Sequence, residues 1–318
     1  MNIELSDDAQ EFGRTALRAF EFAGGDELVQ TAEREPGRRA QLVEPVLDRL
    51  GAWELEPRAG VDDLEAAAAL CRSAGWWAVA YPVAERLCRP GALAVDGLVV
   101  VSGPAPSAAV AGLELTWAVV DLEGRMGTAV PRPMELSPRK CAFVAELDVT
   151  PADGGGTADL PLALVLPCWT LLGMLDRAVE LTRRYVMMRE QFGQPLAGFQ
   201  SVQFQLADAQ VERLGIEELA KHALWSVQTG CPEALDDALA LRLAAIEAAE
   251  TVFRISHQLH GAMGFCDETM LSWVSRYSQP LRRLPLGLSA TRDVLTRRLG
   301  RRGLTGLFSE VDDGVRDT

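Results

Sequence analysis

Long helical segments separated by short breaks dominate the second half of the sequence. Apolar residues at three- and four-residue spacing predict helices over Leu162–Met188, Phe199–Thr229 and Pro232–His260. Gly193 and Pro195 separate the first two helices, and Gly230 and Pro232 separate the second from the third. Because long helices joined by short connections pack side by side in opposite directions, this region predicts an antiparallel four-helix bundle.

The first half of the sequence predicts two smaller units. Residues 1–91 have helical periodicity, with Ser6 as one N-cap and Asp62 or Asp63 as another. Short β-prone runs follow, over residues 98–102, 108–111, 115–120 and 141–145. The glycine-rich stretch Pro151–Thr157 predicts a flexible linker. We therefore expect a mostly α fold with a small middle β domain, divided into residues 1–91, 92–156 and 157–306, with a tail over 307–318.

Charge and composition exclude some classes of partner. The chain has 318 residues, of which 48% are hydrophobic and 24% are charged, as in soluble globular proteins of two or three subdomains. Its formal net charge of -14 argues against nucleic acid, because a nucleic-acid binder needs a basic face. An acyl-CoA is also polyanionic, so composition gives it no support either.

Cysteines, histidines and apolar runs predict a cytoplasmic protein with no metal site and no membrane span. The cysteines are scattered without a Cys-x-x-Cys pair, at Cys71, Cys88, Cys141, Cys168, Cys231 and Cys266. The histidines lack the spacing of a zinc site, at His222, His257 and His260. The most apolar run is Leu160–Leu175, but Pro161, Pro167 and the following Asp176 indicate the buried start of a helix.

The break between the first two long helices presents a cation and an aromatic side chain together. Arg189, Gln191 and Phe192 are predicted to lie on an ordered turn between helices. One interpretation is an ordinary helix corner, in which Arg189 caps the carbonyl end of the first helix. The other is a binding site, because a guanidinium is a permanent forked cation suited to phosphate oxygens.

The residues around this break resemble a known family. Residues 189–208 follow the pattern Arg-x-Gln-Phe-Gly-x-Pro-Leu-x-x-Phe-Gln-x-Val-Gln-x-x-Leu-Ala-Asp, which is similar to the first helical hairpin of the C-terminal domain of flavin-dependent acyl-CoA dehydrogenases. Residues 258–265 resemble that family's Gln-x-x-Gly-Gly-x-Gly-Phe motif, with Ala262 in place of the second glycine. The resemblance covers residues 160–280 well and implies an acyl-CoA dehydrogenase-like fold.

The resemblance also implies a cofactor site shared between subunits. In that family, the hairpin and the glycine motif contact the pyrophosphate and adenosine of FAD held mainly by a neighbouring protomer. The residues that match, or are polar enough to hydrogen-bond the cofactor, are Arg189, Gln191, Phe192, Gln200, Gln258, Gly261 and Gly264. Glycines there would allow backbone amides to approach an anion closely.

The catalytic half of the family's site is missing from this sequence. Removing the α proton of an acyl thioester needs a carboxylate, which the family places at one of two positions. Residues 283–287 and 162–166 stand at those positions, and neither stretch contains an acid. Asp267 and Glu268 lie near the glycine motif, where the family has a structural turn. The family's Thr-Glu-Pro-x-x-Gly-Ser-Asp and Trp-[Ile/Val]-Thr-Asn segments, which hold the flavin ring, are absent as well.

These observations predict a subunit without a catalytic residue of its own. The chain would complete the FAD site of a homologous catalytic acyl-CoA dehydrogenase subunit in an α2β2 assembly, an arrangement known in this family among bacteria that degrade steroid-CoA thioesters. The acyl-CoA substrate would then be bulky, with a steroid side chain as the leading example. Two alternatives stay open: a homotetrameric dehydrogenase with an unrecognised base, and a degenerate helical scaffold without cofactor.

Overall fold

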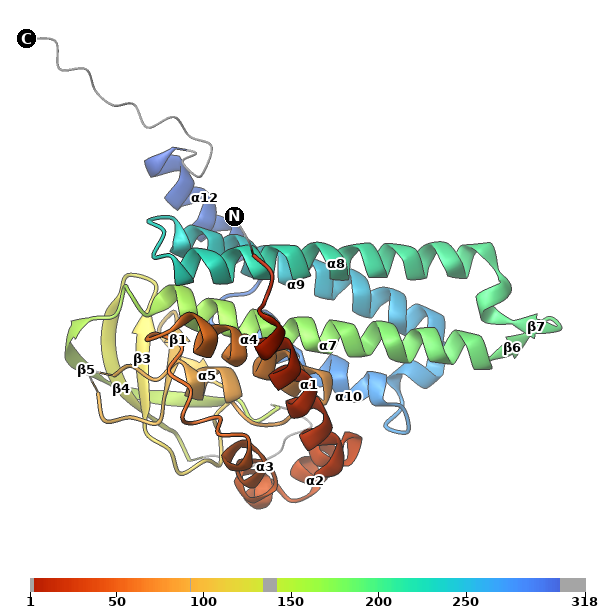
Figure 1. The fold of residues 1–318 in the computed structure, drawn as a ribbon, viewed down its shortest axis with the longest axis horizontal. Helices are drawn as coiled ribbons and strands as arrows, with labels where there is room; N and C mark the ends of the chain where they lie inside the picture. Colours follow the sequence, from red (N-terminus) through yellow and green to blue (C-terminus); the bar gives the residue numbers. More distant parts are fainter. Residues whose placement is uncertain (1–2, 92, 134–141, 304–318) are drawn as a thin grey trace, which may run out of the picture.

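The computed structural model describes residues 3–91, 93–133 and 142–303, so Cys141 and the tail over 307–318 lie outside the described residues. Helices form its N-terminal part: α1 (Asp7–Phe22), α2 (Asp26–Arg34), α3 (Arg39–Arg49), α4 (Val61–Trp76) and α5 (Val83–Leu87). Figure 1 shows these helices packed beside the long helices of the second half. The predicted mostly α fold with a small middle β region is confirmed.

Sequence reasoning was right about one helix cap and wrong about another. The Ser6 hydroxyl accepts a hydrogen bond from the Ala9 backbone at 3.3 Å, as predicted for the start of α1. Helix α4 begins one residue before the predicted aspartates, and Gly60 is its N-cap. Asp63 instead accepts a hydrogen bond from the backbone of Glu56, in the preceding segment. The carboxylate is therefore used to fix the chain entering the helix.

The β region is a five-stranded sheet in the order β1-β3-β4-β5-β2. Its strands are β1 (Gly97–Val101), β2 (Ser107–Ala108), β3 (Trp117–Asp121), β4 (Arg125–Pro131) and β5 (Ala145–Gly155). Strands β1 and β3 are parallel, and the other neighbouring pairs are antiparallel. The sequence did not predict β4, and the predicted strand over 108–111 is limited to β2.

The predicted linker Pro151–Thr157 is wrong, because β5 continues through it. Gly155 pairs with Arg125 of β4, and Pro151 pairs with Gly127. A Cβ on Gly156 would lie 2.2 Å from the Met126 sulfur, so this glycine allows close approach of the chain to its neighbour. Of the three glycines at 154–156, only Gly156 is required by packing, since Gly154 and Gly155 have open space where a Cβ would stand.

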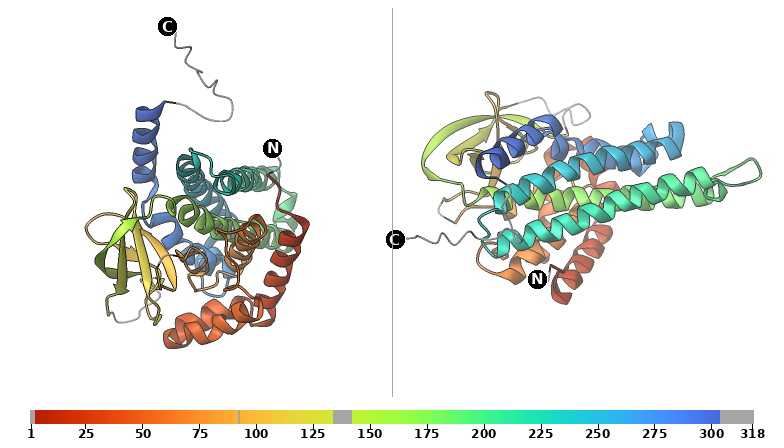
Figure 2. Two further views of the ribbon diagram at one scale, coloured as in Figure 1. Left: turned by 60° about the vertical axis from the view of Figure 1, so that its left-hand side comes forward. Right: turned by 90° about the horizontal axis from the view of Figure 1, so that it is seen from above.

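The second half contains the long helices α7 (Leu160–Met188), α8 (Gln200–Gln228) and α9 (Ala234–His260). Shorter helices, α10 (Met270–Tyr277), α11 (Gln279–Arg283) and α12 (Leu288–Arg302), follow; α10 contacts α7 and α12 contacts α9. Figure 2 shows α7, α8 and α9 running alongside one another, which confirms the predicted antiparallel bundle. Helix α7 is long and apolar enough to cross a membrane, but most of it is buried as the core helix of this fold.

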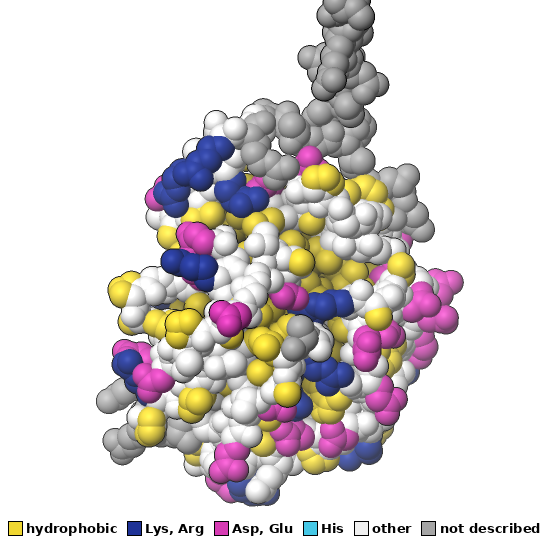
Figure 3. All heavy atoms as spheres, turned by 90° about the vertical axis from the view of Figure 1, so that its left-hand side faces the viewer, with side chains coloured by type: hydrophobic (Ala, Val, Ile, Leu, Met, Phe, Trp, Pro, Cys, Tyr) yellow, Lys and Arg dark blue, Asp and Glu magenta, His cyan; other side chains and the backbone are white. Residues whose placement is uncertain are grey.

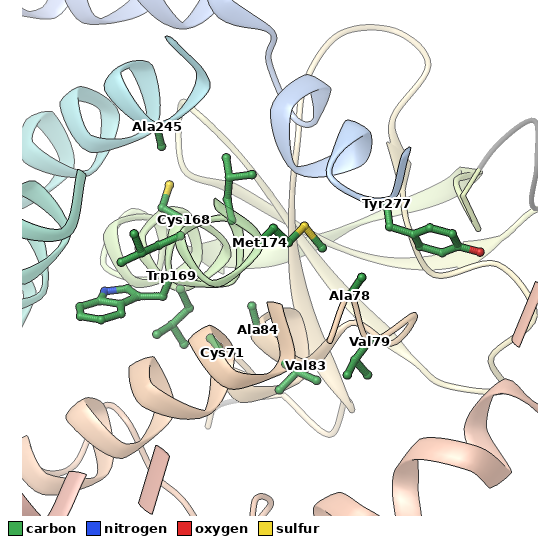
Figure 4. Close-up of a cluster of buried hydrophobic side chains, with 14 of the residues drawn as sticks. Cys71, Ala78, Val79, Val83, Ala84, Cys168, Trp169, Met174, Ala245 and Tyr277 are labelled. Carbon is green, nitrogen blue, oxygen red and sulfur yellow. The ribbon is translucent and has the colours of Figure 1, made fainter. Parts of the chain in front are cut away.

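Helix α7 is also the element on which the rest of the molecule packs. Figure 4 shows buried side chains of α4, α5 and α9 beside those of α7, among them Cys71, Ala84 and Ala245 around Cys168, Trp169 and Met174. An ion-pair network links α4, α7 and α8, since Asp176 accepts from Arg72 at 2.7 Å and from Arg213 at 2.6 Å. The free end of α7 is thereby held on a rigid support.

Candidate functional site

The predicted turn between the first two long helices is a short β-hairpin at the far end of the bundle (Figure 1). Its strands are β6 (Glu190–Gln191) and β7 (Gln194–Pro195). Phe192 and Gly193 form the tip with φ angles of 52° and 83°, the left-handed backbone that a two-residue hairpin turn needs. A bulky residue adopts that conformation only at a cost, so an aromatic side chain at this tip is an informative outlier.

The cation at the base of the hairpin is open to solvent. The Arg189 backbone N–H donates to the Tyr185 carbonyl at 2.8 Å, and its carbonyl accepts from Leu196 at 2.8 Å. Its guanidinium is exposed and makes no hydrogen bond or ion pair with any residue that the structure describes. Arg189 thus caps α7 through its backbone N–H, while its guanidinium remains available for an anion.

The glycine motif lies at the same end of the bundle. Gly261 ends α9 with a φ of 61°, and residues Gly261–Phe265 form the 3₁₀ turn η3. The His260 ring, at the end of α9, stacks on the Tyr185 ring of α7 with centroids 4.3 Å apart. This stack brings the two predicted motifs together, although they are far apart in the sequence.

The predicted site residues divide by their exposure. Those open to solvent are Arg189, Gln191, Phe192, Gln200, Gln258 and Gly261. Gly264 is buried, and a Cβ there would lie 3.0 Å from the Cβ of His260. Gly264 therefore faces the interior, and Gly261, with open space where a Cβ would stand, is the glycine that an anion could approach.

Large apolar side chains surround this end of the bundle. Phe192 is 93% exposed, Met188 75% and Phe265 70%. Further exposed apolar side chains continue along α8, at Phe204, Val211, Leu214 and Leu219. The opposite end of the molecule, shown in Figure 3, mixes acidic, basic and hydrophobic side chains. Extended exposed apolar surface on a folded chain marks a surface that another molecule covers.

A second feature is an internal cavity of about 100 Å³, where the N-terminal helices, the sheet and the bundle meet. Ala163 and Leu164, at the start of α7, line it from one side, and Leu284 and Pro285 line it from another. Both stretches were compared in the sequence analysis with the positions at which the family resemblance implies a catalytic acid. Small-molecule sites usually measure about 300–1,000 Å³, so the cavity has no room for a flavin ring together with an acyl thioester.

The turn after α11 is fixed by a buried arginine that the sequence analysis missed. Arg242 on α9 is 3% exposed and donates to the carbonyls of Leu281, Leu284 and Leu286 at 3.1, 2.6 and 2.6 Å. Burial lowers the pKa of its guanidinium. The Arg242 hydrogen bonds hold the turn that contains Leu284 against the cavity.

One acid that the sequence analysis missed reaches the cavity. Among the described residues that line it, Glu85 of α5 is the carboxylate. Burial raises the pKa of Glu85, while the nearby Arg39 opposes that effect. No sequence motif marks Glu85, since α5 is short and Glu85 approaches the cavity through tertiary packing alone.

Comparison with known proteins identifies the region that carries this site. Residues 165–299 match the family model described as acyl-CoA dehydrogenase, C-terminal domain. This helical region belongs to the acyl-CoA dehydrogenase family. Acyl-CoA dehydrogenase FadE28 of Mycobacterium tuberculosis is 37% identical over 92 residues, which are 29% of this chain and 27% of FadE28. The matched stretch thus spans about a quarter of that relative.

Solved structures extend the likeness to the whole fold. The Tcur3481-Tcur3483 steroid ACAD has a TM-score of 0.77 at 18% identity, covering 94% of this chain and 99% of that chain. The ChsE4-ChsE5 complex from Mycobacterium tuberculosis has a TM-score of 0.73 at 16% identity, covering 96% of this chain and 100% of that chain. At such identities the comparison shows a shared acyl-CoA dehydrogenase fold.

Proposed function

We propose that this chain is the non-catalytic subunit of a heteromeric, flavin-dependent acyl-CoA dehydrogenase, and that it completes the FAD site of a homologous catalytic partner. The proposal rests on the difference between the cavity and the hairpin of this chain. The cavity at the positions where the family resemblance places a base is small, about 100 Å³, whereas the Arg189 guanidinium on the hairpin is exposed and pairs with no residue that the structure describes.

The residues present fit one part of the cofactor. The exposed guanidinium of Arg189 suits a pyrophosphate, and Phe192 offers an apolar edge to the adenosine part. The internal cavity of about 100 Å³ does not fit the flavin ring. When bound in the partner, FAD would supply the hydride acceptor for α,β-dehydrogenation of an acyl-CoA. This chain would bind the phosphates and exclude water at the subunit boundary.

The exposed apolar residues support a protein partner for the same surface. Phe204 and Val211, on one face of α8, are 60% and 67% exposed, and they continue the apolar surface of the hairpin. Two similar structures, the Tcur3481-Tcur3483 steroid ACAD and the ChsE4-ChsE5 complex, carry the names of two proteins. We infer an α2β2 assembly with a cytoplasmic location, and a bulky CoA thioester such as a steroid side chain as the substrate.

Absorbance of the purified protein tests the proposal. The chain is purified alone and after co-expression with the homologous subunit encoded beside it, and flavin is measured in the visible spectrum. A yellow complex with a colourless isolated chain is expected. A yellow, active isolated chain would replace the proposal with a homo-oligomeric enzyme, and colourless samples in both cases would favour a helical scaffold.

The Arg189→Ala variant tests whether this arginine contacts the cofactor of the complex. Losing one charge-assisted contact to a phosphate costs about 1.5–3 kcal/mol, so flavin affinity of the complex should fall at least tenfold. Arg184→Ala is the matched control, because Arg184 is an exposed arginine of α7 that pairs with Glu180. Equal flavin occupancy in both variants would remove Arg189 from the site.

Glu85 gives the alternative enzyme a specific candidate. A carboxyl with a raised pKa in a cavity is the type of group that acts as a general base. The leading proposal expects Glu85→Gln to leave the dehydrogenation rate of the complex within about twofold. A loss of about 100-fold or more, the contribution typical of a general base, would assign catalysis to Glu85.

A further inference from the structure

Two histidine stacks hold the end of α9. The His260 ring lies on Tyr185 of α7 with ring planes 20° apart, and its Nδ1 donates to the Ser256 carbonyl at 2.9 Å. The His257 ring lies on Phe265 of η3, with centroids 4.3 Å apart and planes 15° apart. Stacked rings of this kind contribute about 0.5–1.5 kcal/mol beyond the area they bury. Both histidines therefore fix backbone that would otherwise be a free helix end.

The stacks connect the hairpin to the glycine turn. Tyr185 lies one helical turn before Arg189, and its carbonyl accepts the Arg189 N–H at 2.8 Å. On the other side, a Cβ on Gly264 would lie 3.0 Å from the Cβ of His260 and 3.2 Å from Nδ1 of His257. The glycine of the turn thus packs directly on the two histidines, one of which packs on the base of the hairpin.

The surroundings of both rings favour neutral imidazoles. Burial is the main cause that lowers the pKa of His257 and of His260, and the positive charge of Arg282 lowers that of His257 further. Hydrogen bonds with the backbone of Gly264 and Ser256 oppose the effect of burial at His257 and His260, respectively. The groups that face the rings are Tyr185 from α7, Ser275 from α10, whose hydroxyl lies 3.0 Å from Nε2 of His257, and Arg282 from α11. Among the described residues, no carboxylate forms an ion pair with either ring that would offset a positive charge.

We propose that His257 and His260 are positioning residues that hold the hairpin and the glycine turn in one arrangement, and that they do so as neutral imidazoles. The role of this arrangement in meeting a partner's cofactor rests on the function proposed above. The arrangement itself is a property of the isolated chain, so the two statements can fail separately.

The sign of the pH dependence follows from the lowered pKa of each histidine. A histidine freed from the stack regains an ordinary pKa near about 6.5, whereas the stacked ring resists protonation. The ordered arrangement is therefore fully favoured above about pH 6.5 and loses stability as the pH falls through the lowered pKa values.

Hydrogen exchange on the isolated chain tests the positioning role directly. After correction for intrinsic rates, backbone amides of residues 185–200 and 257–266 should exchange more readily at pH 5.5 than at pH 7.5. His257→Phe and His260→Phe keep an aromatic ring but cannot titrate, so each should flatten this pH dependence. His222→Phe is the control, because its ring lies against Trp225 on α8 and should leave the wild-type pH profile in place.

A second variant keeps the test valid if a phenylalanine disturbs folding. Tyr185→Leu removes one stack without changing a histidine, and it should raise hairpin exchange at every pH while circular dichroism stays unchanged. In the co-expressed complex, flavin affinity should follow the same pH profile as the exchange. If hydrogen exchange behaves as expected but the complex binds no flavin, the proposed function is contradicted and the positioning role is not. A flavin-bound wild-type complex with pH-independent exchange, or normal exchange in Tyr185→Leu, would overturn the positioning role.

Discussion

Gly173→Ala should destabilise the fold strongly, because this glycine lies where α4 and α7 cross. A Cβ on Gly173 would stand 1.9 Å from the Arg72 carbonyl oxygen and 2.9 Å from the Trp76 nitrogen. Gly75 meets α7 in the same way, 1.9 Å from the Thr170 carbonyl oxygen. All of these neighbours are backbone atoms, so no side chain can rotate to make room.

The magnitude follows from the movement that the methyl group requires. Real Cβ contacts essentially never fall below 3.0 Å, so the two helices would have to separate by more than 1 Å at the crossing. Overpacking of a core costs about 1–3 kcal/mol and occasionally more, whereas alanine gains about 1 kcal/mol over glycine inside a helix. Because the clash is with rigid backbone, we expect the overpacking cost to be at least about 3 kcal/mol, the top of that range, and the net loss in the free energy of unfolding to be at least about 2 kcal/mol.

Urea unfolding followed by circular dichroism measures this loss, with Gly215→Ala as the matched control. Gly215 is an exposed glycine inside α8 with no heavy atom within 4 Å of an added Cβ. The control should gain up to about 1 kcal/mol from helix propensity. The reasoning about the crossing would be refuted if Gly173→Ala were as stable as the wild type or matched the gain of Gly215→Ala.

Further predictions concern buried and surface charges. Arg242→Met should lower the free energy of unfolding by about 2–5 kcal/mol, because the carbonyls of the turn after α11 lose their donor. Arg254→Met, at an exposed position of the same helix, is the control and should change the free energy of unfolding by less than about 0.5 kcal/mol in the same urea titration. Hydrogen bonds from Arg183 and Arg184 lower the pKa of Glu180 to about 2 from 4.5, so its contribution to stability is present above pH 4.5 and is lost as the pH falls toward 2. Glu180→Gln should thus be less stable than the wild type at pH 6, and chemical unfolding should show the two curves converging on acidification; a gap that stays constant would contradict the ion pair's role.

The helical bundle could be predicted closely because glycine and proline mark the breaks between its helices. Gly193 and Pro195 cannot continue a helix, and α7, α8 and α9 end or begin within two residues of the predicted bounds. The hairpin and glycine motifs could be placed on the correct elements for the same reason. Their meeting at one end of the bundle depends on the His260–Tyr185 stack, which sequence spacing does not reveal.

Elsewhere the sequence was ambiguous because tertiary neighbours decide what a residue does. Three consecutive glycines, residues 154–156, predicted a linker, yet Gly156 is required by the closeness of Met126. Asp63 has the chemistry of a helix cap, yet it binds the backbone of Glu56. Glu85 has no motif, and its raised pKa arises only when α5 is packed against the sheet and the bundle. Composition and spacing carry no signal for contacts of this kind.

Apolar side chains are buried beside the cavity but exposed at the hairpin. Burial of core side chains beside the cavity, such as Leu164 and Met174, stabilises the isolated chain, because each buried Å² of apolar surface contributes about 25 cal/mol. Holding Phe192 in a left-handed conformation at 93% exposure has the opposite effect on the isolated chain, since the residue is strained and in contact with water. A partner that covered Phe192 in an assembly would offset that cost. Both features therefore favour the proposal that the partner carries out catalysis and that this subunit helps to bind the partner's cofactor.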